Sequence, residues 1–219
     1  MTSEEKYIVF FDLDKTLLTV NSGKVLAWAA YKEGLLSNRN LIRAIFLSII
    51  YKLHLIKSVR ITVLMVKWLK GISEVSVQSF AEKLVKQKLI DLIRPSMIEE
   101  INKHKKQKAR IIILSAALPY ICQPLANHLN INGVICSTME IDQGLFTGMP
   151  WGKMCMEEEK TVRVRMYCEK NAFNLQDAYC YGDSYSDRFV LKIVGNPICV
   201  NPDKKLYKLA MIKNWPLMN

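Results

Sequence analysis

Short apolar runs alternate with helical patterns along most of this 219-residue chain, and this alternation restricts its fold more than any other feature. A short apolar run between turn signals is typical of a buried strand, whereas apolar residues three and four positions apart indicate a helix. Strands that alternate with helices form a parallel sheet covered by helices. The predicted strands are Tyr7–Phe11, Arg110–Leu114, Gly133–Cys136, Ala178–Tyr181 and Pro197–Val200.

Helical spacing follows four of these strands and precedes the second. Pro95 and Pro119 stand where a proline suits the first turn of a helix. A small hairpin is predicted over Thr138–Thr147, with its turn at Asp142-Gln143-Gly144. We therefore predict an α/β protein, with helices at about 96–107, 119–129, 157–171, 184–192 and 203–212.

One long segment breaks the alternation, because residues 22–92 show only the helical spacing of apolar residues. A helical segment of this size after the first strand is best read as an insertion. We predict an α/β core domain formed by residues 1–20 and 92–219, and a helical bundle formed by residues 21–91.

Part of the predicted bundle is unusually apolar. Residues Leu41–Ile50 are mostly aliphatic, but Arg43 lies within them and Lys52 follows, so the stretch is too short to cross a bilayer. Two interpretations stay open. The stretch packs inside the bundle, or a basic and apolar surface contacts an anionic membrane or the apolar tail of a substrate.

The net charge of +11 favours anionic partners. The densest basic run, Lys103–Arg110, contains no aromatic residue that could stack on a base, so we expect a solvated helix end there and no nucleic acid. The N-terminus lacks the basic start and apolar core of a signal peptide, and the six cysteines form no Cys-x-x-Cys pair. We therefore expect reduced thiols in a cytoplasmic protein. The sequence does not indicate the oligomeric state.

Two carboxylates, Asp12 and Asp14, follow the first predicted strand directly. Side chains two positions apart on extended backbone point to the same side. Both can therefore enter the crevice at the carboxyl end of the strand, where open α/β sheets place their ligands. Neighbouring anions repel each other unless a metal ion or a shared proton relieves the repulsion, so the pair suggests a metal-assisted carboxylate site.

Three later segments supply partners for this pair. Ser115 ends the second strand just before a predicted helix start, where a hydroxyl and free amides can hold a phosphate. Lys160 lies in an acidic helical segment and would be an ordinary surface residue if taken alone. Asp183 and Asp187 follow the fourth strand and a glycine; an N-cap role would explain one of them but not both.

Together these segments resemble the four ordered motifs of the haloacid dehalogenase superfamily: Asp-x-Asp-x-Thr, strand-Ser, Lys and Gly-Asp-x-x-x-Asp. The resemblance covers the chain outside the helical insertion and is strongest to the phosphoserine-phosphatase-like subgroup, subfamily IB. It implies a Rossmann-like parallel sheet with helices on both faces. It also implies that the inserted bundle is an all-helical cap of the C1 type, which closes over the site and selects the leaving group.

The resemblance further implies the chemical roles of the two aspartates in the first motif. Asp12 would attack phosphorus and become a transient aspartyl phosphate, and Asp14 would act as general acid and then as general base. Mg²⁺ would be held by the Asp12 carboxylate, the Asp14 main-chain carbonyl and Asp183, because oxygen donors suit this ion.

The remaining motif residues would serve the metal and the phosphate. By the same resemblance, Asp187 would orient a metal-bound water or Lys160 from outside the ligand set. Ser115 and the amide of Ala116 would hold phosphate oxygens, and Lys160 would neutralise charge that develops in the transition state.

Three positions depart from the subgroup and bear on the substrate. Lys15 replaces a small residue in the first motif, and Ser186 replaces an asparagine in the last. Asn21 stands where phosphoserine phosphatases carry a glutamate that binds the substrate ammonium, so phosphoserine is not favoured. These three residues are predicted substrate contacts.

Three functions follow from these observations. The leading hypothesis is a Mg²⁺-dependent phosphomonoesterase that acts on a small phosphorylated molecule. The second is a phosphatase of a lipid-linked monophosphate, such as phosphatidylglycerophosphate, at the membrane surface. The third, from another class, is a non-catalytic protein that binds a phosphate or a partner on this scaffold.

Overall fold

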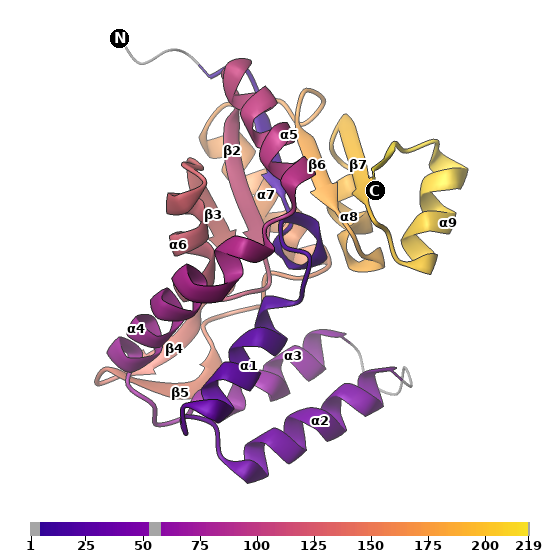
Figure 1. The fold of residues 1–219 in the computed structure, drawn as a ribbon. Coiled ribbons are helices and arrows are strands. Elements are labelled where there is room, and N and C mark those ends of the chain that lie inside the picture. Colours follow the sequence, from indigo (N-terminus) through magenta and orange to yellow (C-terminus); the bar gives the residue numbers. More distant parts are fainter. Residues whose placement is uncertain (1–4, 53–57, 219) are drawn as a thin grey trace.

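A six-stranded parallel sheet forms the centre of the protein (Figure 1). The computed structural model describes residues 5–52 and 58–218. The strands are arranged in the order β3-β2-β1-β6-β7-β8, and all neighbours run parallel. The five predicted strands are confirmed, whereas the short edge strand β8 was not predicted. Their bounds are β1 (Ile8–Phe11), β2 (Arg110–Ser115), β3 (Gly133–Cys136), β6 (Tyr179–Gly182), β7 (Asn196–Val200) and β8 (Leu217–Met218).

Helices cover both faces of this sheet, as predicted. Successive side chains of a strand point to opposite faces, and β1 divides its side chains accordingly. Val9 and Phe11 join the apolar cluster beneath α5 (Pro95–Lys106) and α6 (Pro119–His128). Ile8 and Phe10 join the opposite cluster, which is covered by α7 (Glu158–Lys170), α8 (Arg188–Leu191) and α9 (Lys204–Lys213). A short 3-10 turn, Tyr185–Asp187, begins the predicted helix 184–192.

Within the described residues, the regular elements of the predicted insertion are all helices or helical turns; residues 53–57 lie outside the described residues. Its two ends are joined, because Leu18 and Ile93 form an antiparallel bridge, the Thr19 amide donates to the Leu92 carbonyl at 2.9 Å, and the Arg94 amide donates to the Leu17 carbonyl at 2.8 Å. The domain boundaries at 20/21 and 91/92 stay a prediction. The helices are α1 (Ser22–Lys32), α2 (Asn38–Lys52), α3 (Ser58–Val66) and α4 (Glu74–Leu84), with short helical turns at Lys67–Leu69, Val85–Leu89 and Ile90–Leu92.

The insertion is not packed uniformly on the core. Phe80, Ala81 and Leu84 of α4 are buried in the same apolar cluster as residues of α6, so α4 is anchored on the sheet domain. In contrast, α2 lies on the side of the insertion turned away from the sheet (Figure 1). The last helix of the bundle therefore fixes it to the core, and α2 forms its outer edge.

A two-stranded hairpin joins the core to this insertion. The predicted hairpin is confirmed, with β4 (Met139–Asp142) and β5 (Leu145–Pro150); its second strand extends beyond the predicted Thr147. The Gly71 amide donates to the Phe146 carbonyl at 2.8 Å, and the Glu74 amide donates to the Gly144 carbonyl at 2.9 Å. The hairpin thus holds the segment that connects α3 to α4.

The outer side of α2 exposes large apolar side chains. Ile42, Ile45, Phe46 and Ile49 are 67%, 53%, 60% and 51% exposed, whereas Leu47 on the other side is 7% exposed. The core-packing interpretation therefore describes only one side of this helix. Among the described residues, no helix combines the length and the hydropathy that a membrane span would need.

A buried polar group lies apart from the sheet's carboxyl end. The basic run Lys103–Lys106 forms the last turn of α5, where cations complement the helix dipole. His104 of this run is buried; its Nδ1 lies 2.8 Å from the Tyr7 hydroxyl and its Nε2 lies 2.9 Å from the Tyr181 hydroxyl. Burial lowers the pKa of His104 to about 4. His104 is therefore a neutral core residue at pH 7.

Candidate active site

Asp12 lies where the order of the strands reverses. β1 ends at Phe11, and the Asp12 amide donates to the carbonyl of Tyr181 in β6 at 2.9 Å. From β1 the chain proceeds outward to β2 and β3 on one side, and β6 follows on the other side of β1. Open α/β sheets bind ligands at the carboxyl end of strands at this switch point. The fold therefore places the Asp12 carboxylate at the expected position, where it is 9% exposed.

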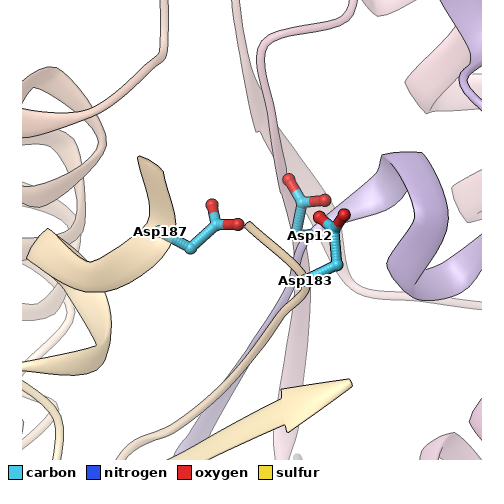
Figure 2. A group of neighbouring side chains, drawn as sticks. All are labelled: Asp12, Asp183 and Asp187. Atoms are coloured by element: carbon cyan, nitrogen blue, oxygen red, sulfur yellow. The ribbon is translucent and has the colours of Figure 1, made fainter. Parts of the chain in front are cut away.

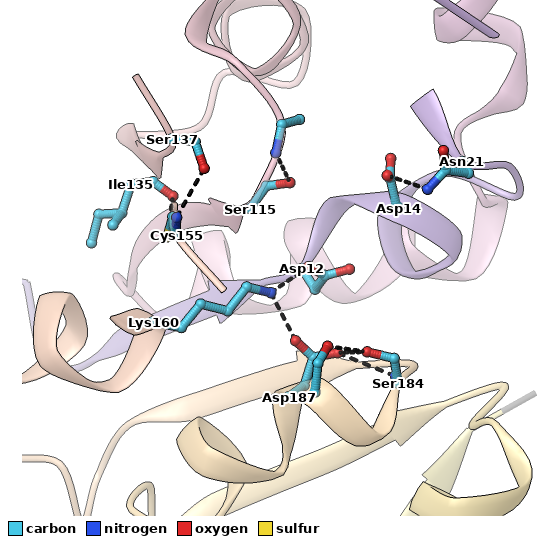
Figure 3. Close-up of polar contacts among 12 residues, drawn as sticks. Asp12, Asp14, Asn21, Ser115, Ile135, Ser137, Cys155, Lys160, Ser184 and Asp187 are labelled. Atoms are coloured by element: carbon cyan, nitrogen blue, oxygen red, sulfur yellow. Dashed lines mark hydrogen bonds and ion pairs between the residues drawn. The ribbon is translucent and has the colours of Figure 1, made fainter. Parts of the chain in front are cut away.

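Lys160 joins two of the predicted aspartates. Its Nζ donates to Asp12 Oδ1 at 2.6 Å and to Asp187 Oδ1 at 2.7 Å (Figure 3). The side chain comes from the first turn of α7 and is buried, unlike an ordinary surface lysine. Burial by itself lowers the pKa of Lys160, but the two carboxylates outweigh it and hold the pKa well above its usual value. The ammonium group therefore stays charged inside the protein.

Three carboxylates converge beside this lysine. Asp12, Asp183 and Asp187 each offer an oxygen, and these oxygens lie within 4.8 Å of one another (Figure 2). Asp183 directly follows β6, and Gly182 before it lets the chain pass close to Asp187, since an added Cβ would lie 2.8 Å from the Asp187 Cβ. The two ends of the Gly-Asp-x-x-x-Asp motif are thus brought together by the glycine.

Ser184 is a residue of this site that sequence reasoning did not identify. Its hydroxyl donates to Asp187 Oδ2 at 2.8 Å, and its amide donates to the same oxygen at 3.2 Å. Ser184 and Asp187 thereby form a capping box at the start of the turn. The Ser-x-x-Asp spacing is a recognised signal for this arrangement and could have revealed it. Asp187 therefore has both a capping role and an ion pair with Lys160.

The carboxylate cluster has the electrostatics of a cation site. Burial raises the pKa of Asp12 to about 7; the charge of Lys160 opposes this rise, and the charge of Asp187 adds to it. Burial and the charges of Asp12 and Asp187 raise the pKa of Asp183 to about 8. Lys160 supplies one positive charge for three carboxylates, so a further cation would relieve the remaining repulsion. Because all the donors are oxygens, the cluster fits Mg²⁺ in its chemistry.

Asp14 is held by the start of the first inserted helix. Asn21 Nδ2 donates to Asp14 Oδ2 at 2.7 Å (Figure 3). The Ser22 amide donates to Asp14 Oδ1 at 2.8 Å. Asn21 Oδ1 also accepts from the Lys24 amide at 3.0 Å and caps α1. Burial raises the pKa of Asp14, while its hydrogen bonds to Ser22 oppose that shift. Both ends of the Asn21 amide are therefore engaged within the protein.

The other predicted site residues are less closely joined to this cluster. Ser115, at the end of β2, is buried and its Oγ accepts from the Ala117 amide at 3.1 Å; Ala116 is half-buried beside it. Lys15 is exposed, with φ of 62°, and its charge opposes the rise in the pKa of Asp14 and of Asp183. The Ser186 hydroxyl lies 2.6 Å from that of Ser184. The structure thus brings Asp12, Lys160, Asp183 and Asp187 into one cluster.

Known proteins share both the sequence pattern and this fold. Residues 9–192 match the haloacid dehalogenase-like hydrolase family. A histidinol-phosphatase from Neisseria meningitidis is 26% identical over 98% of this chain and 99% of its own length. A protein with unknown function from Bordetella pertussis has 22% identity, a TM-score of 0.89 and coverage of 99% of both chains. A substrate-bound phosphoserine phosphatase has 15% identity and a TM-score of 0.73, covering 99% of this chain and 94% of its own.

These findings confirm the predicted superfamily, the Rossmann-like α/β fold and the phosphatase class. Because the matched segment contains all four motifs together with the carboxylate cluster, the chain belongs to the haloacid dehalogenase-like hydrolase family.

Proposed function

We propose that the protein is a Mg²⁺-dependent phosphomonoesterase that hydrolyses a small phosphorylated molecule in the cytoplasm. The observation that carries this proposal is the buried Asp12 carboxylate, which pairs with Lys160 at 2.6 Å and faces Asp183 at the switch point of the sheet. A nucleophile needs such fixed positioning beside a positive charge that can stabilise a transferring phosphoryl group.

Asp12 carries out the attack in the proposed reaction. One of its carboxylate oxygens forms a bond to phosphorus as the bond to the leaving alcohol oxygen breaks. Asp14 donates a proton to that oxygen and then accepts a proton from the attacking water. The water oxygen bonds to phosphorus, the bond from phosphorus to Asp12 breaks, and inorganic phosphate leaves. Asn21 and the Ser22 amide hold Asp14 in position for both proton transfers.

Three groups bind the phosphate in this proposal. Lys160 already lies beside the nucleophile and neutralises negative charge on the phosphoryl oxygens. The Ser115 hydroxyl and the Ala116 amide lie at the end of the neighbouring strand β2 and donate hydrogen bonds to the same group. Lys15 adds a further exposed cation at the edge of the site.

The Asp12 carboxylate, the Asp14 main-chain carbonyl and Asp183 are the proposed Mg²⁺ ligands. When bound, the ion relieves the repulsion between the anionic nucleophile and the anionic phosphate. Asp187 keeps Lys160 oriented through the 2.7 Å ion pair and is itself fixed by Ser184. In this division of roles, Asp187 contacts Lys160 alone, whereas Asp12 serves both Lys160 and the cation.

The substrate is proposed only as a class. One relative carries the name histidinol-phosphatase, and a structural neighbour is a phosphoserine phosphatase. Asn21 provides no negative charge for an ammonium group, and its amide is already bound to Asp14 and Lys24. A phosphorylated small molecule whose binding does not depend on a carboxylate at this position fits better than phosphoserine.

A lipid-linked monophosphate is a second candidate, and the exposed apolar side of α2 is the observation that favours it. An apolar and basic outer surface on the inserted bundle would bring the site close to a lipid phosphate. A phosphatase screen that includes amino-acid, sugar, nucleotide and lipid monophosphates separates the two candidates. Release of phosphate from lipid substrates alone would favour the second.

The test of the reaction is hydrolysis of p-nitrophenyl phosphate with Mg²⁺ and with EDTA. We expect the wild type to release phosphate only with Mg²⁺, and we expect Asp12→Asn to lose activity by at least about 1,000-fold, since an uncharged amide is a far weaker nucleophile than a carboxylate. Asp91→Asn, an exposed aspartate outside the site, serves as the matched control. A wild type without activity would favour a non-catalytic binding protein, and equal activity in Asp12→Asn would exclude Asp12 as nucleophile.

A further inference from the structure

The outer side of α2 carries an exposed apolar stripe. Ile42, Ile45, Phe46 and Ile49 follow the spacing of one helix face, and each is more than half exposed. A helix of a globular protein normally turns such a stripe toward the core. Here Leu47 is buried, so the helix is already anchored through its other side. An exposed apolar stripe of this kind marks an interaction surface.

The chain segment that carries this stripe contains charges of one sign only. Between Glu33 and Glu74 the sequence contains no aspartate or glutamate. Arg39 and Arg43 stand one turn apart on α2, and both are exposed. In the same acid-free segment lie seven cations, which are Arg39, Arg43, Lys52, Lys57, Arg60, Lys67 and Lys70. A large share of the net charge of +11 is therefore concentrated in this part of the chain.

We propose that this surface docks on an anionic lipid bilayer. We call it the docking face, and it consists of Arg39, Ile42, Arg43, Ile45, Phe46 and Ile49. The apolar side chains enter the boundary between headgroups and acyl chains, as they do in interfacial amphipathic helices. The two arginines remain at the level of the lipid phosphates and are attracted by the negative surface potential.

The charge pattern favours a bilayer over a second copy of the chain. A symmetric dimer through the docking face would place Arg39 and Arg43 near their own copies. No acidic residue between Glu33 and Glu74 is present to pair with them, so like charges would meet. Nucleic acid would neutralise the arginines but would leave four apolar side chains against a polar backbone. An anionic membrane satisfies both parts of the surface.

The position of α2 agrees with this arrangement. The helix lies on the side of the insertion that is turned away from the sheet (Figure 1), and the carboxylate cluster lies at the ends of β1 and β6. Docking through α2 therefore does not use any residue of the proposed reaction. The inference stands apart from the proposed hydrolysis of a small phosphorylated molecule, and either one can fail without the other; only the lipid-linked candidate shares the α2 surface with it.

Vesicle sedimentation tests the proposal with the full chain. We expect the protein to sediment with vesicles of phosphatidylcholine and phosphatidylglycerol, and to sediment much less with phosphatidylcholine alone. Ile45→Ser with Phe46→Ser should lower the partition coefficient roughly tenfold or more through the lost apolar area. Arg39→Gln with Arg43→Gln should also lower it, by roughly 25-fold, since each cation near the surface contributes about fivefold.

Two matched pairs control for exposed side chains in general. Met211→Ser with Ile212→Ser removes apolar side chains that are 56% and 76% exposed on α9, and should leave partitioning unchanged. Lys86→Gln with Lys88→Gln removes two exposed cations outside the acid-free segment and should have no more than a twofold effect. All four double variants should keep the wild-type circular dichroism spectrum and urea-unfolding midpoint, which shows that they fold whether or not the protein is active.

Several results would overturn the proposal. A wild type that remains in the supernatant with anionic vesicles, or that binds neutral vesicles equally well, contradicts it. Partitioning that is unchanged in both docking-face variants also contradicts it. A dimer in light scattering that Ile45→Ser with Phe46→Ser converts to a monomer would assign the face to a second copy. Binding to a DNA duplex without binding to vesicles would assign it to nucleic acid.

Discussion

The carboxylate cluster and the docking face depart from ordinary burial in opposite directions. At the ends of β1 and β6, charged side chains are enclosed within the protein; on α2, large apolar side chains face outward. Ionised groups are almost never buried without partners, and an exposed apolar stripe gains nothing from folding. Neither arrangement is explained by stability alone. We infer that the two regions serve two separate interactions, one with the proposed cation and phosphate inside the fold and one with the proposed membrane at its surface.

Removal of the buried cation of Lys160 should have the largest effect on stability and activity. Lys160→Met leaves the Asp12 and Asp187 carboxylates without their shared partner. We expect a loss of about 3–5 kcal/mol in the free energy of unfolding. We also expect a fall in kcat of about 100- to 1,000-fold, since the transferring group loses its positive charge. Urea unfolding and phosphate release measure the two effects.

Lys170→Met provides the control from the exposed end of the same helix. It should keep wild-type activity and change stability by less than about 0.5 kcal/mol. A Lys160→Met variant that is as stable and active as this control would show that the buried ion pairs do not matter.

His104 tests whether burial of a polar group is costly outside the cluster as well. Its pKa is about 4 in the folded protein and about 6.5 when unfolded. As pH falls from about 6.5 to 4, the unfolded chain binds a proton that the folded protein does not, so stability should fall in this window. The contribution is about 3 kcal/mol at most. Urea unfolding at pH 7 and pH 5 measures it.

His104→Gln should reduce this loss of stability between pH 7 and pH 5, whereas His128→Gln, at an exposed histidine, should not. The comparison between variants separates His104 from the carboxylates that titrate in the same range. An identical pH dependence in all three proteins would contradict the assigned neutral state.

Asn21 tests how the insertion supports the buried site. Asn21→Ser keeps a residue that can cap α1 but removes the amide donor to Asp14. We expect kcat to fall about tenfold with little change in KM, because the acid and base loses one positioning contact. A rise in KM with unchanged kcat would instead make Asn21 a substrate contact. Steady-state kinetics on one substrate distinguishes these outcomes.

Phe46 should show the smallest effect. Phe46→Ser removes a side chain that is 60% exposed and should change the free energy of unfolding by less than about 0.5 kcal/mol. Its neighbour Leu47 is 7% exposed, so Leu47→Ser should cost about 2–4 kcal/mol. Equal losses from both substitutions, measured by urea unfolding, would mean that Phe46 is covered in solution.

The sequence predicted the sheet because its strands are encoded locally as short apolar runs. Asp12 and Asp183 could also be placed from the sequence, because they directly follow β1 and β6. Lys160 was different: its helix has a mixed, largely polar sequence, and only the motif order suggested its role. Its burial depends on two aspartates that are distant in the chain, which no local pattern reveals.

Other features also depended on contacts between distant segments. The Asn21 amide was expected to face a substrate, but its contact with Asp14 depends on where α1 begins. The stripe on α2 could be read from its spacing, but spacing does not tell whether another element covers it. β8 has two residues, too few for a periodic signal. Tertiary packing determined each of these outcomes.

The bridge between Leu18 and Ile93 has a consequence for how such a protein can diversify. The chain leaves the sheet domain and returns to it at adjacent points, and backbone hydrogen bonds close that junction independently of side-chain identity. The segment between can therefore change in length and composition without shifting the register of β1. Contacts of α4 with α6, and those of Asn21 and Ser22 with Asp14, are the main restrictions on such exchange. Outside these contacts, the residues of the insertion and the residues proposed for phosphoryl transfer can therefore change independently in evolution.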